Sequence, residues 1–552
     1  MSARSVGQSV AKAALVVAVA TLLARVAGFA RTMVFSGSVG TSPVGDAYQT
    51  VNTLPNVVYE VAAGGALAAI AVPLVAGRLG AGAREDADRS ASALLTWAVV
   101  VLVPLSAIVF LAAPWLSDLL LDDTTRPGSV ALGTTMLRIF APQVALYGIG
   151  VVLAGVLQAH RRFLAAALAP LFSSLVVIVA YVAYGSLVPT PVGADEVGDR
   201  AVWVLAGGTT LGVVVLSLPL LVPALRTGTR LRATLSFPGG LGRRAAQLAG
   251  AGVLALAAQQ AAVALTLWLT HAPRTLDTGV VNVYAIIQAI YLLPYAVLAV
   301  PVATAAFPAL AHAEGASTEG AEPAAAATLS RSLRGIVLLT SGAAATLIAV
   351  ARPVGEFFLA WDRGATGAGR DALAALPGGL AAYAPGLVGF SIAALLTRAL
   401  YVRGEPMHAA GAVAVGWLVA GLLPLAWIPT GSDAGSTLGL LGISSTLGMT
   451  GSALVLALLV RRAWGAEALA GTGRTVGAAV VAAAVAIAVG DTVGRALDGS
   501  GLLGSLVAGL LIGAATMGVH LVVMSLADRA GFRQLVERGR RRRQHQGQEQ
   551  GQ

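Results

Sequence analysis

Two arginines stand inside a long apolar stretch near the start of the chain. The stretch "ALVVAVATLLARVAGFARTMVFSG" begins at Ala14 and contains Arg25 and Arg31. A helix needs about 20 apolar residues to cross a bilayer, and inserting an arginine within it costs at least about 2.5 kcal/mol. Arginine stays charged and presents a planar fork of N–H donors that fits a phosphate or a carboxylate. The two residues therefore predict a site for an anion within the membrane, such as a pyrophosphate headgroup.

The spacing of the two arginines allows them to line one cavity. Arg25 follows Lys12 by 13 residues, which is about 20 Å along a helix. Six residues separate Arg31 from Arg25, so their side chains diverge by about 120° around the helix unless Gly28 bends it. The alternative for Arg31, nearer the opposite end, is a side chain that snorkels to the membrane surface. For Arg25 the alternative is snorkelling or a purely structural ion pair.

Three further polar residues follow in and before the second apolar stretch. Asp46 and Glu60 are predicted counter-charges for the two arginines. The alternative for each is an ion pair that only neutralises an arginine. Asn56 follows Pro55, and we expect it to cap or bridge a broken start of the second membrane helix.

The composition places the chain among polytopic membrane proteins. Of its 552 residues, 57% are hydrophobic and only 11% are charged, and the mean hydropathy is +0.81. A soluble protein of this size could not bury so much apolar surface. The formal charge of +10 is therefore assigned to arginines that face the cytoplasm and anionic lipids, and we expect no nucleic-acid partner. The chain has no cysteine, which excludes disulfides, thiolate metal sites and cysteine nucleophiles.

The hydropathy predicts an all-α fold with about fourteen membrane-spanning helices. The first span could be mistaken for a signal peptide, but apolar character resumes beyond Arg25 and similar spans follow. The predicted spans lie near residues 10–35, 48–77, 91–113, 131–158, 163–185, 201–223, 246–270, 280–311, 332–350, 381–402, 408–429, 438–460, 475–493 and 502–527.

The charges of the connecting loops alternate along the chain. One set of loops is rich in arginine: Arg78, Arg84, Arg89, Arg161, Arg162, Arg226, Arg230, Arg232, Arg243, Arg244, Arg461 and Arg462. The other set is acidic or nearly uncharged: Asp118, Asp122, Asp123, Asp195, Glu196, Asp199 and Asp433. Because cytoplasmic loops carry the excess of basic residues, this alternation predicts that both termini lie in the cytoplasm.

Two stretches of similar sequence predict an internal duplication. "FAPQVALYGIGVVLAGVLQAHRRF" and "YAPGLVGFSIAALLTRALYVRGEP" align without gaps, which pairs Pro142 with Pro385 at an offset of 243 residues. We therefore expect two parallel six-helix repeats, followed by two extra C-terminal helices. The predicted parts are an N-terminal lobe (1–235), a C-terminal lobe (236–465), two additional helices (466–530) and a basic, Gln/Gly-rich disordered cytoplasmic tail (531–552).

Duplicated halves indicate transport by alternating access around a site between them. Lys12 is the only lysine and lies outside any glycine-rich turn, so the chain lacks a Walker A site for ATP. The histidines show no metal-ligand spacing, and the first loop after the arginines is too short for a catalytic domain. We expect neither an enzymatic reaction nor a metal or cofactor. Without an ATP site, the membrane potential or an ion gradient is expected to reset the cycle.

The first two spans resemble the opening of the MurJ/MviN lipid II flippases, within the multidrug/oligosaccharidyl-lipid/polysaccharide (MOP) exporter superfamily. The resemblance rests on "LLARVAGFARTMVFSGSVG" and "GDAYQTVNTLPNVVYEVAAGGALAAIAVPLVAG". The matching positions are Arg25, Gly28-Phe29, Arg31, Asp46-Ala47, Leu54-Pro55-Asn56 and Gly65-Ala66. The resemblance implies a bacterial plasma-membrane protein that moves undecaprenyl-pyrophosphate-linked peptidoglycan precursor to the outer leaflet. It also implies a central cavity lined by Arg25 and Arg31, and a lipid-tail groove formed by the last two helices.

The sequence departs from the family pattern at several cavity positions. The family often has a basic pair where this chain has Tyr59 and Glu60, and a glutamate where it has Gly64. The family's arginine in the eighth helix falls at Ala289, with Gln288 beside it. The resemblance therefore implies a less positive cavity, in which Gln288 joins the candidate substrate-binding residues.

Three functions remain open at this stage. The first is a lipid II flippase, with anionic lipids at the cytoplasmic face and the cell-wall synthesis machinery as partners. The second is an exporter of another polyprenyl-linked glycan or small molecule. The third is a non-transporting membrane scaffold that recruits partners through its basic tail. Replacing Arg25 by alanine distinguishes the transporters from the scaffold, because only the scaffold would keep its function.

Overall fold

The structure is a computed structural model that describes residues 3–61, 74–123, 126–237, 241–271, 274–315, 321–497 and 501–528. Throughout these ranges the regular elements are helices, apart from an isolated β-bridge between Thr275 and Ser432. The predicted all-α fold is confirmed. The chain divides into two compact units, each composed of several segments.

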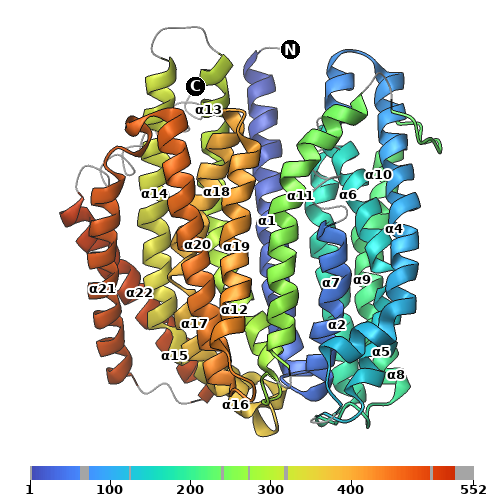
Figure 1. The fold of residues 1–552 in the computed structure, drawn as a ribbon, viewed down its shortest axis with the longest axis vertical. Helices are drawn as coiled ribbons and strands as arrows, with labels where there is room; N and C mark the ends of the chain where they lie inside the picture. Colours follow the sequence, from blue (N-terminus) through green and yellow to red (C-terminus); the bar gives the residue numbers. More distant parts are fainter. Residues whose placement is uncertain are drawn as a thin grey trace. The chain divides into compact units, whose positions relative to one another are not determined.

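Unit 1 comprises residues 1–286, 361–373 and 430–434. Its helices are labelled in Figure 1 and have the following bounds: α1 (Ala3–Ser38), α2 (Pro43–Tyr59), α4 (Arg84–Leu120), α5 (Ser129–Phe140), α6 (Gln143–Ala159), α7 (Phe163–Leu187), α8 (Asp199–Val202), α9 (Gly208–Ser217), α10 (Leu221–Leu225) and α11 (Leu241–Leu269). Short π and 3₁₀ turns at Trp203–Gly207 and Leu218–Leu220 join α8, α9 and α10 into one apolar segment.

Unit 2 comprises residues 287–360, 374–429 and 435–552. Most of α12 (Val280–Pro294) belongs to it, with α13 (Val300–Gly315), α14 (Ala321–Ala349), α15 (Ala351–Trp361), α17 (Leu376–Tyr383), α18 (Gly386–Val402), α19 (Pro406–Trp427), α20 (Ala434–Trp464), α21 (Thr472–Ala496) and α22 (Gly501–Ala527). The short helix α16 (Arg370–Ala374) lies at the end of the middle segment of unit 1.

Thirteen helical segments of the described chain are long and apolar enough to cross a membrane. Each coincides with one of the predicted spans, from Val19–Ser38 to Gly501–Ala527. The remaining predicted span, 48–77, begins within α2, and its middle falls outside the described residues, as does the predicted tail 531–552. Helix α2 itself begins at Pro43 after the N-cap Ser42 and continues through Pro55.

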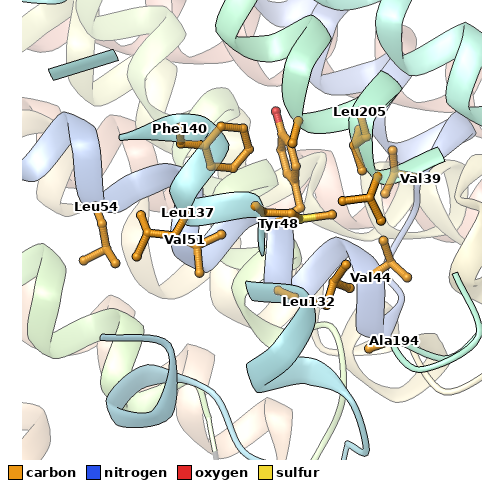
Figure 2. Close-up of a cluster of buried hydrophobic side chains, with 14 of the residues drawn as sticks. Val39, Val44, Tyr48, Val51, Leu54, Leu132, Leu137, Phe140, Ala194 and Leu205 are labelled. Atoms are coloured by element: carbon orange, nitrogen blue, oxygen red, sulfur yellow. The ribbon is translucent and has the colours of Figure 1, made fainter. Parts of the chain in front are cut away.

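A cluster of aromatic side chains forms part of the core of unit 1. Tyr48 packs against Phe140, Phe35 and Tyr181 with ring centroids 5.6, 5.3 and 5.9 Å away. Its buried hydroxyl shares hydrogen bonds of 2.8 Å with the hydroxyls of Tyr181 and Thr209. Figure 2 shows Tyr48 surrounded by apolar side chains. A buried tyrosine needs such a polar partner, so these bonds fix α2 against α7 and α9.

Small residues let two helices of unit 2 approach each other closely. A Cβ atom added to Gly448 of α20 would lie 2.3 Å from the carbonyl oxygen of Gly416 in α19. The reverse contact, from Gly416 to the Gly448 carbonyl, would be 2.8 Å. Side chains cannot occupy this space. Close backbone contact of this kind is a main source of packing energy between helices in lipid, where the hydrophobic effect does not drive association.

We predict that Gly448→Leu destabilises unit 2, because the new side chain must separate α19 from α20. The expected loss is about 1–3 kcal/mol, as for other overpacked contacts, measured as a fall in the thermal unfolding midpoint in detergent. Gly451→Leu in the same helix is the matched control, since nothing lies within 4 Å of its added Cβ. Equal midpoints for the two variants would show that the close crossing is not important for stability.

Candidate substrate-binding arginines and the polar cluster at the α1–α2 turn

Arg25 and Arg31 are the candidate ligands for an anion, and both side chains are exposed on α1. The helix is continuous through Gly28, so both arginines belong to one rigid element. Within the described chain, neither guanidinium has an ion pair or a hydrogen bond. Arg31 lies close enough to the hydroxyls of Tyr147 and Tyr181 to interact with them electrostatically. Because no hydrogen bond within the described chain occupies them, the guanidinium N–H groups of Arg25 and Arg31 are available to a ligand.

Asp46 has a different partner from the arginines that we expected. Its carboxylate lies 3.6 Å from Nη1 of Arg126, and the two side chains are only 2% and 3% exposed. It also accepts hydrogen bonds from the backbone N–H of Gly279 at 2.6 Å and from Nδ2 of Asn282 at 2.8 Å. In the part of the chain that is described, the partner of Asp46 is thus Arg126 rather than Arg25 or Arg31.

Arg126 was not among the residues predicted from the sequence. It follows the acidic stretch after α4, and its Nη2 donates to the backbone carbonyl of Asp277 at 2.6 Å. The available signal was a lone arginine in an otherwise acidic loop. A buried charge is tolerated only when it is paired and hydrogen-bonded, so Arg126 and Asp46 require each other.

A second buried carboxylate, Asp362, binds the turn between α1 and α2. It accepts hydrogen bonds from the hydroxyls of Ser36 and Thr41 at 2.5 and 3.0 Å, from the Thr41 N–H at 2.8 Å and from the Gly364 N–H at 2.7 Å. Burial raises the pKa of Asp362, and these hydrogen bonds oppose that shift. The next residue, Arg363, donates to the carbonyls of Ser38 and Val188. Residues 361–364 are thereby attached to the N-terminal part of unit 1.

The conformation of the turn itself depends on a glycine. Gly40 has a φ of +75°, a left-handed conformation that favours glycine. A Cβ at this position would lie 2.8 Å from the backbone nitrogen of Gly364 and from Cβ of Arg363. The turn can therefore approach residues 362–364 closely. We call Ser36, Thr41, Asp46, Arg126, Asn282 and Asp362 the turn cluster.

His271 lies beside the turn cluster in a buried, neutral form. Its Nε2 is 3.1 Å from the hydroxyl of Thr50, and its Nδ1 is 2.8 Å from the carbonyl of Leu267. Because a carbonyl can only accept, Nδ1 carries the proton and Nε2 accepts from Thr50. Burial, reinforced by the positive charge of Arg126, lowers the pKa of His271 to about 4.

The remaining predicted residues lie elsewhere. Asn56 does not cap a helix, because α2 begins at Pro43; instead its amide donates to the carbonyl of Asn52 at 3.2 Å. That expectation was wrong because Pro55 is accommodated within a continuous helix. Glu60, half-buried at the end of α2, has no ion pair with either arginine among the described residues. Gln288 is half-buried in α12, within unit 2.

The long apolar helices, one of which carries two arginines without a protein partner among the described residues, define a multi-pass membrane protein. A solved structure of lipid II flippase MurJ in an inward closed conformation matches with a TM-score of 0.69 at 16% identity, over 93% of this chain and 99% of that chain. An inward-facing MATE family multidrug resistance transporter of the MOP superfamily matches with a TM-score of 0.62 at 17% identity, over 82% and 98% of the two chains.

The sequence comparisons then give the family. The sequence profile of the lipid II flippase MurJ family matches residues 35–511, so the chain belongs to this family. The probable lipid II flippase MurJ of Rhizobium meliloti is 29% identical over 353 residues, which are 61% of this chain and 60% of that protein. The lipid II flippase MurJ of Burkholderia cenocepacia is 29% identical over 187 residues, 33% and 36% of the two chains. The match therefore spans about three-fifths of the first relative's length.

We predict that Asp46→Ala destabilises the protein by about 3–5 kcal/mol, because it leaves Arg126 buried without a counter-charge. The double variant Asp46→Leu/Arg126→Met should recover part of this loss, since it removes both charges. Chemical unfolding in detergent measures the two values. As a control, Asp491→Ala removes the carboxylate of an exposed pair with Arg495 and should change little. A double variant less stable than Asp46→Ala would contradict the pairing.

We predict that the buried, neutral His271 makes the free energy of unfolding fall at acidic pH. The unfolded chain takes up a proton near pH 6.5, whereas the folded chain does so only near pH 4. Stability due to this residue is therefore complete above about pH 6.5 and is lost as the pH falls to 4, by about 3 kcal/mol.

This component is measured as the difference in pH dependence between wild type and His271→Gln, which keeps a donor and an acceptor at this position. The control is His408→Gln, whose side chain is 69% exposed. If wild type and His271→Gln lost stability in parallel between pH 6.5 and 4, buried neutral His271 would not be the cause.

Proposed function

We propose that this chain flips lipid II, the undecaprenyl-pyrophosphate-linked precursor of peptidoglycan, from the inner to the outer leaflet by alternating access. The observation that carries the proposal is that Arg25 and Arg31 are exposed on a membrane helix and have no ion pair or hydrogen bond among the described residues. Retaining two such charges within the bilayer requires a compensating interaction. A pyrophosphate supplies it, because guanidinium groups bind phosphate oxygens through paired, charge-assisted hydrogen bonds. Membership of the lipid II flippase MurJ family supports the same substrate.

Arg25 and Arg31 are the proposed pyrophosphate ligands. Glu60, Asn56 and Gln288 contribute weaker polar contacts to the glycan or headgroup. Asp46 we assign to holding the turn cluster, because its carboxylate is buried and fully engaged with Arg126, Gly279 and Asn282.

The proposed orientation has both termini in the cytoplasm. It is supported by the arginines at the α6–α7 turn and after α10, in contrast with the acidic residues between α7 and α8. In this orientation the turn cluster faces the outside. Residues 274–286, 361–373 and 430–434, which lie within the predicted C-terminal lobe (236–465), belong to unit 1 with it. We propose that these attachments release when the pathway opens outward.

The organisation of the sequence supports the transport cycle. The parallel repeats predicted at 1–235 and 236–465, with two additional helices at 466–530, would form the moving halves and the extra lipid-tail groove. The cell-wall synthesis machinery, which consumes the flipped precursor, is the proposed functional partner. No catalytic step is needed for this cycle.

The test is complementation of a host depleted of its own copy of this protein. We expect wild type to clear inner-leaflet lipid II and Arg25→Ala to leave it accumulated, with transport slowed about 10- to 100-fold through loss of a charged hydrogen-bond donor. Arg25→Lys should be intermediate, because it keeps the charge without the planar fork. Mass spectrometry and leaflet accessibility of lipid-linked precursors provide the measurement.

Arg495→Ala is the matched control, because it removes an exposed arginine from the last turn of α21. It should support clearance like wild type. Accumulation of a different polyprenyl-linked glycan would support the proposed transport activity but would show that lipid II is not the substrate. Full clearance by Arg25→Ala would reject the role of the arginines, and unchanged precursors after depletion would reject export altogether.

A further inference from the structure

An apolar groove of about 1070 Å³ lies on unit 1 between α1, α7 and the segment that joins α9 to α10. Its volume lies slightly above the usual range for small-molecule pockets, about 300–1,000 Å³. Ala169 and Leu220 are buried in it, whereas Phe163, Leu164 and Phe172 remain more than 40% exposed. The groove therefore has a closed floor and an open rim. Figure 1 labels α1, α7 and α9, which all belong to unit 1.

The polar residues that line this groove are Arg161 and Arg162, and all other lining residues are apolar. Both arginines are exposed, and within the described chain neither side chain has an ion pair or a hydrogen bond. They stand at the α6–α7 turn, so the positive charge is concentrated at one end of an apolar trough. A groove with positive charge at one end and apolar residues along the rest is complementary to a molecule with an anionic headgroup and hydrocarbon chains.

The local backbone fixes the position of the arginine pair. Arg161 has a φ of 58°, the one positive value among the described residues other than glycine. Such a conformation is unfavourable for a side chain of this size and persists only when its surroundings impose it. Arg162 follows as the residue before the first turn of α7, where no side chain caps the free N–H groups. The helix end adds a partial positive charge beside the two guanidinium groups.

We propose that this groove binds an anionic diacyl phospholipid of the cytoplasmic leaflet, with its phosphate on Arg161 and Arg162 and its chains along α7. The site is separate from the proposed pyrophosphate site. Val17, which lines the groove, precedes Arg25 by eight residues, or about 12 Å along α1. The groove also continues onto the exposed apolar side of α7 at Leu175, which suits bulk lipid.

The headgroup must provide the selectivity of this site. Lipid tails are as apolar as the groove, so moving a chain from the bilayer into it gains little through the hydrophobic effect. Each basic residue near an anionic headgroup contributes a favourable electrostatic term. The groove should therefore retain phosphatidylglycerol and not phosphatidylcholine, a difference that an apolar site alone would not show.

The experiment titrates the purified full-length chain in detergent with phosphatidylglycerol or phosphatidylcholine and counts bound lipids by native mass spectrometry. For Arg161→Gln/Arg162→Gln, we expect phosphatidylglycerol binding at the highest-affinity site to weaken about thirtyfold, with phosphatidylcholine unchanged. The matched control is Arg461→Gln/Arg462→Gln, an exposed adjacent pair in the last turn of α20 that lines no part of the groove. It should weaken binding less than threefold.

A second variant is needed because Arg161→Gln/Arg162→Gln could weaken lipid binding by disturbing the fold of the α6–α7 turn. Ala165→Trp fills the groove without changing its charge and should also remove the high-affinity lipid. Equal binding of the two phospholipids, or equal losses in the two arginine-pair variants, would overturn the proposal. Displacement of phosphatidylglycerol by a lower concentration of a polyprenyl diphosphate would overturn it too, and would assign the groove to the transported lipid. None of these readouts depends on transport.

Discussion

The buried carboxylate of Asp46 holds together segments that the sequence places far apart. Its ligands come from the loop after α4, through Arg126, and from the start of α12, through Gly279 and Asn282. A charge taken out of water must be matched by a counter-charge and hydrogen bonds, or folding loses several kcal/mol. The start of α2, the loop after α4 and the start of α12 therefore have to meet at one place. Asp362 applies the same constraint to the loop at 361–364.

Unit 1 contains buried charged side chains that bind within the protein and exposed arginines whose N–H donors are free, within the described chain, to bind a ligand. Asp46, Arg126 and Asp362 are buried, and their charges are engaged by an ion pair or by hydrogen bonds within the protein, so they are suited to holding the chain in one conformation. Arg25 and Arg31 are exposed and have no protein partner among the described residues. Arginines left without a counter-charge in a membrane helix gain most from an anionic ligand. Arg161 and Arg162, at the α6–α7 turn beside the groove, are likewise exposed and have no ion pair or side-chain hydrogen bond among the described residues.

In a membrane, the stability of helix packing depends strongly on close backbone contacts and on buried polar interactions. In a bilayer, apolar side chains are surrounded by lipid that is as apolar as they are. Moving such a side chain from lipid into a contact between helices therefore adds little stability through the hydrophobic effect. The helices are held instead by close contacts, such as Gly416 against Gly448, and by buried polar bonds, such as those of Tyr48. The proposed transport cycle requires some of these contacts to be exchanged. Exchange of interface ion pairs and hydrogen bonds, like those of the turn cluster, is one known form of switching between two conformations.

The sequence by itself determined the membrane class and thirteen of the predicted spans, since an apolar run of bilayer length is a local property. It also singled out Arg25 and Arg31, because a charge inside such a run is visible without a partner. Only the tertiary structure decided that Asp46 pairs with Arg126, that Asp362 binds Ser36 and Thr41, and that Asn56 lies within a continuous helix. Ion pairs between distant segments depend on which helices pack together, and that arrangement has no local signature in the sequence. The lipid groove is of the same kind, because it exists only where α1, α7 and the α9–α10 segment meet.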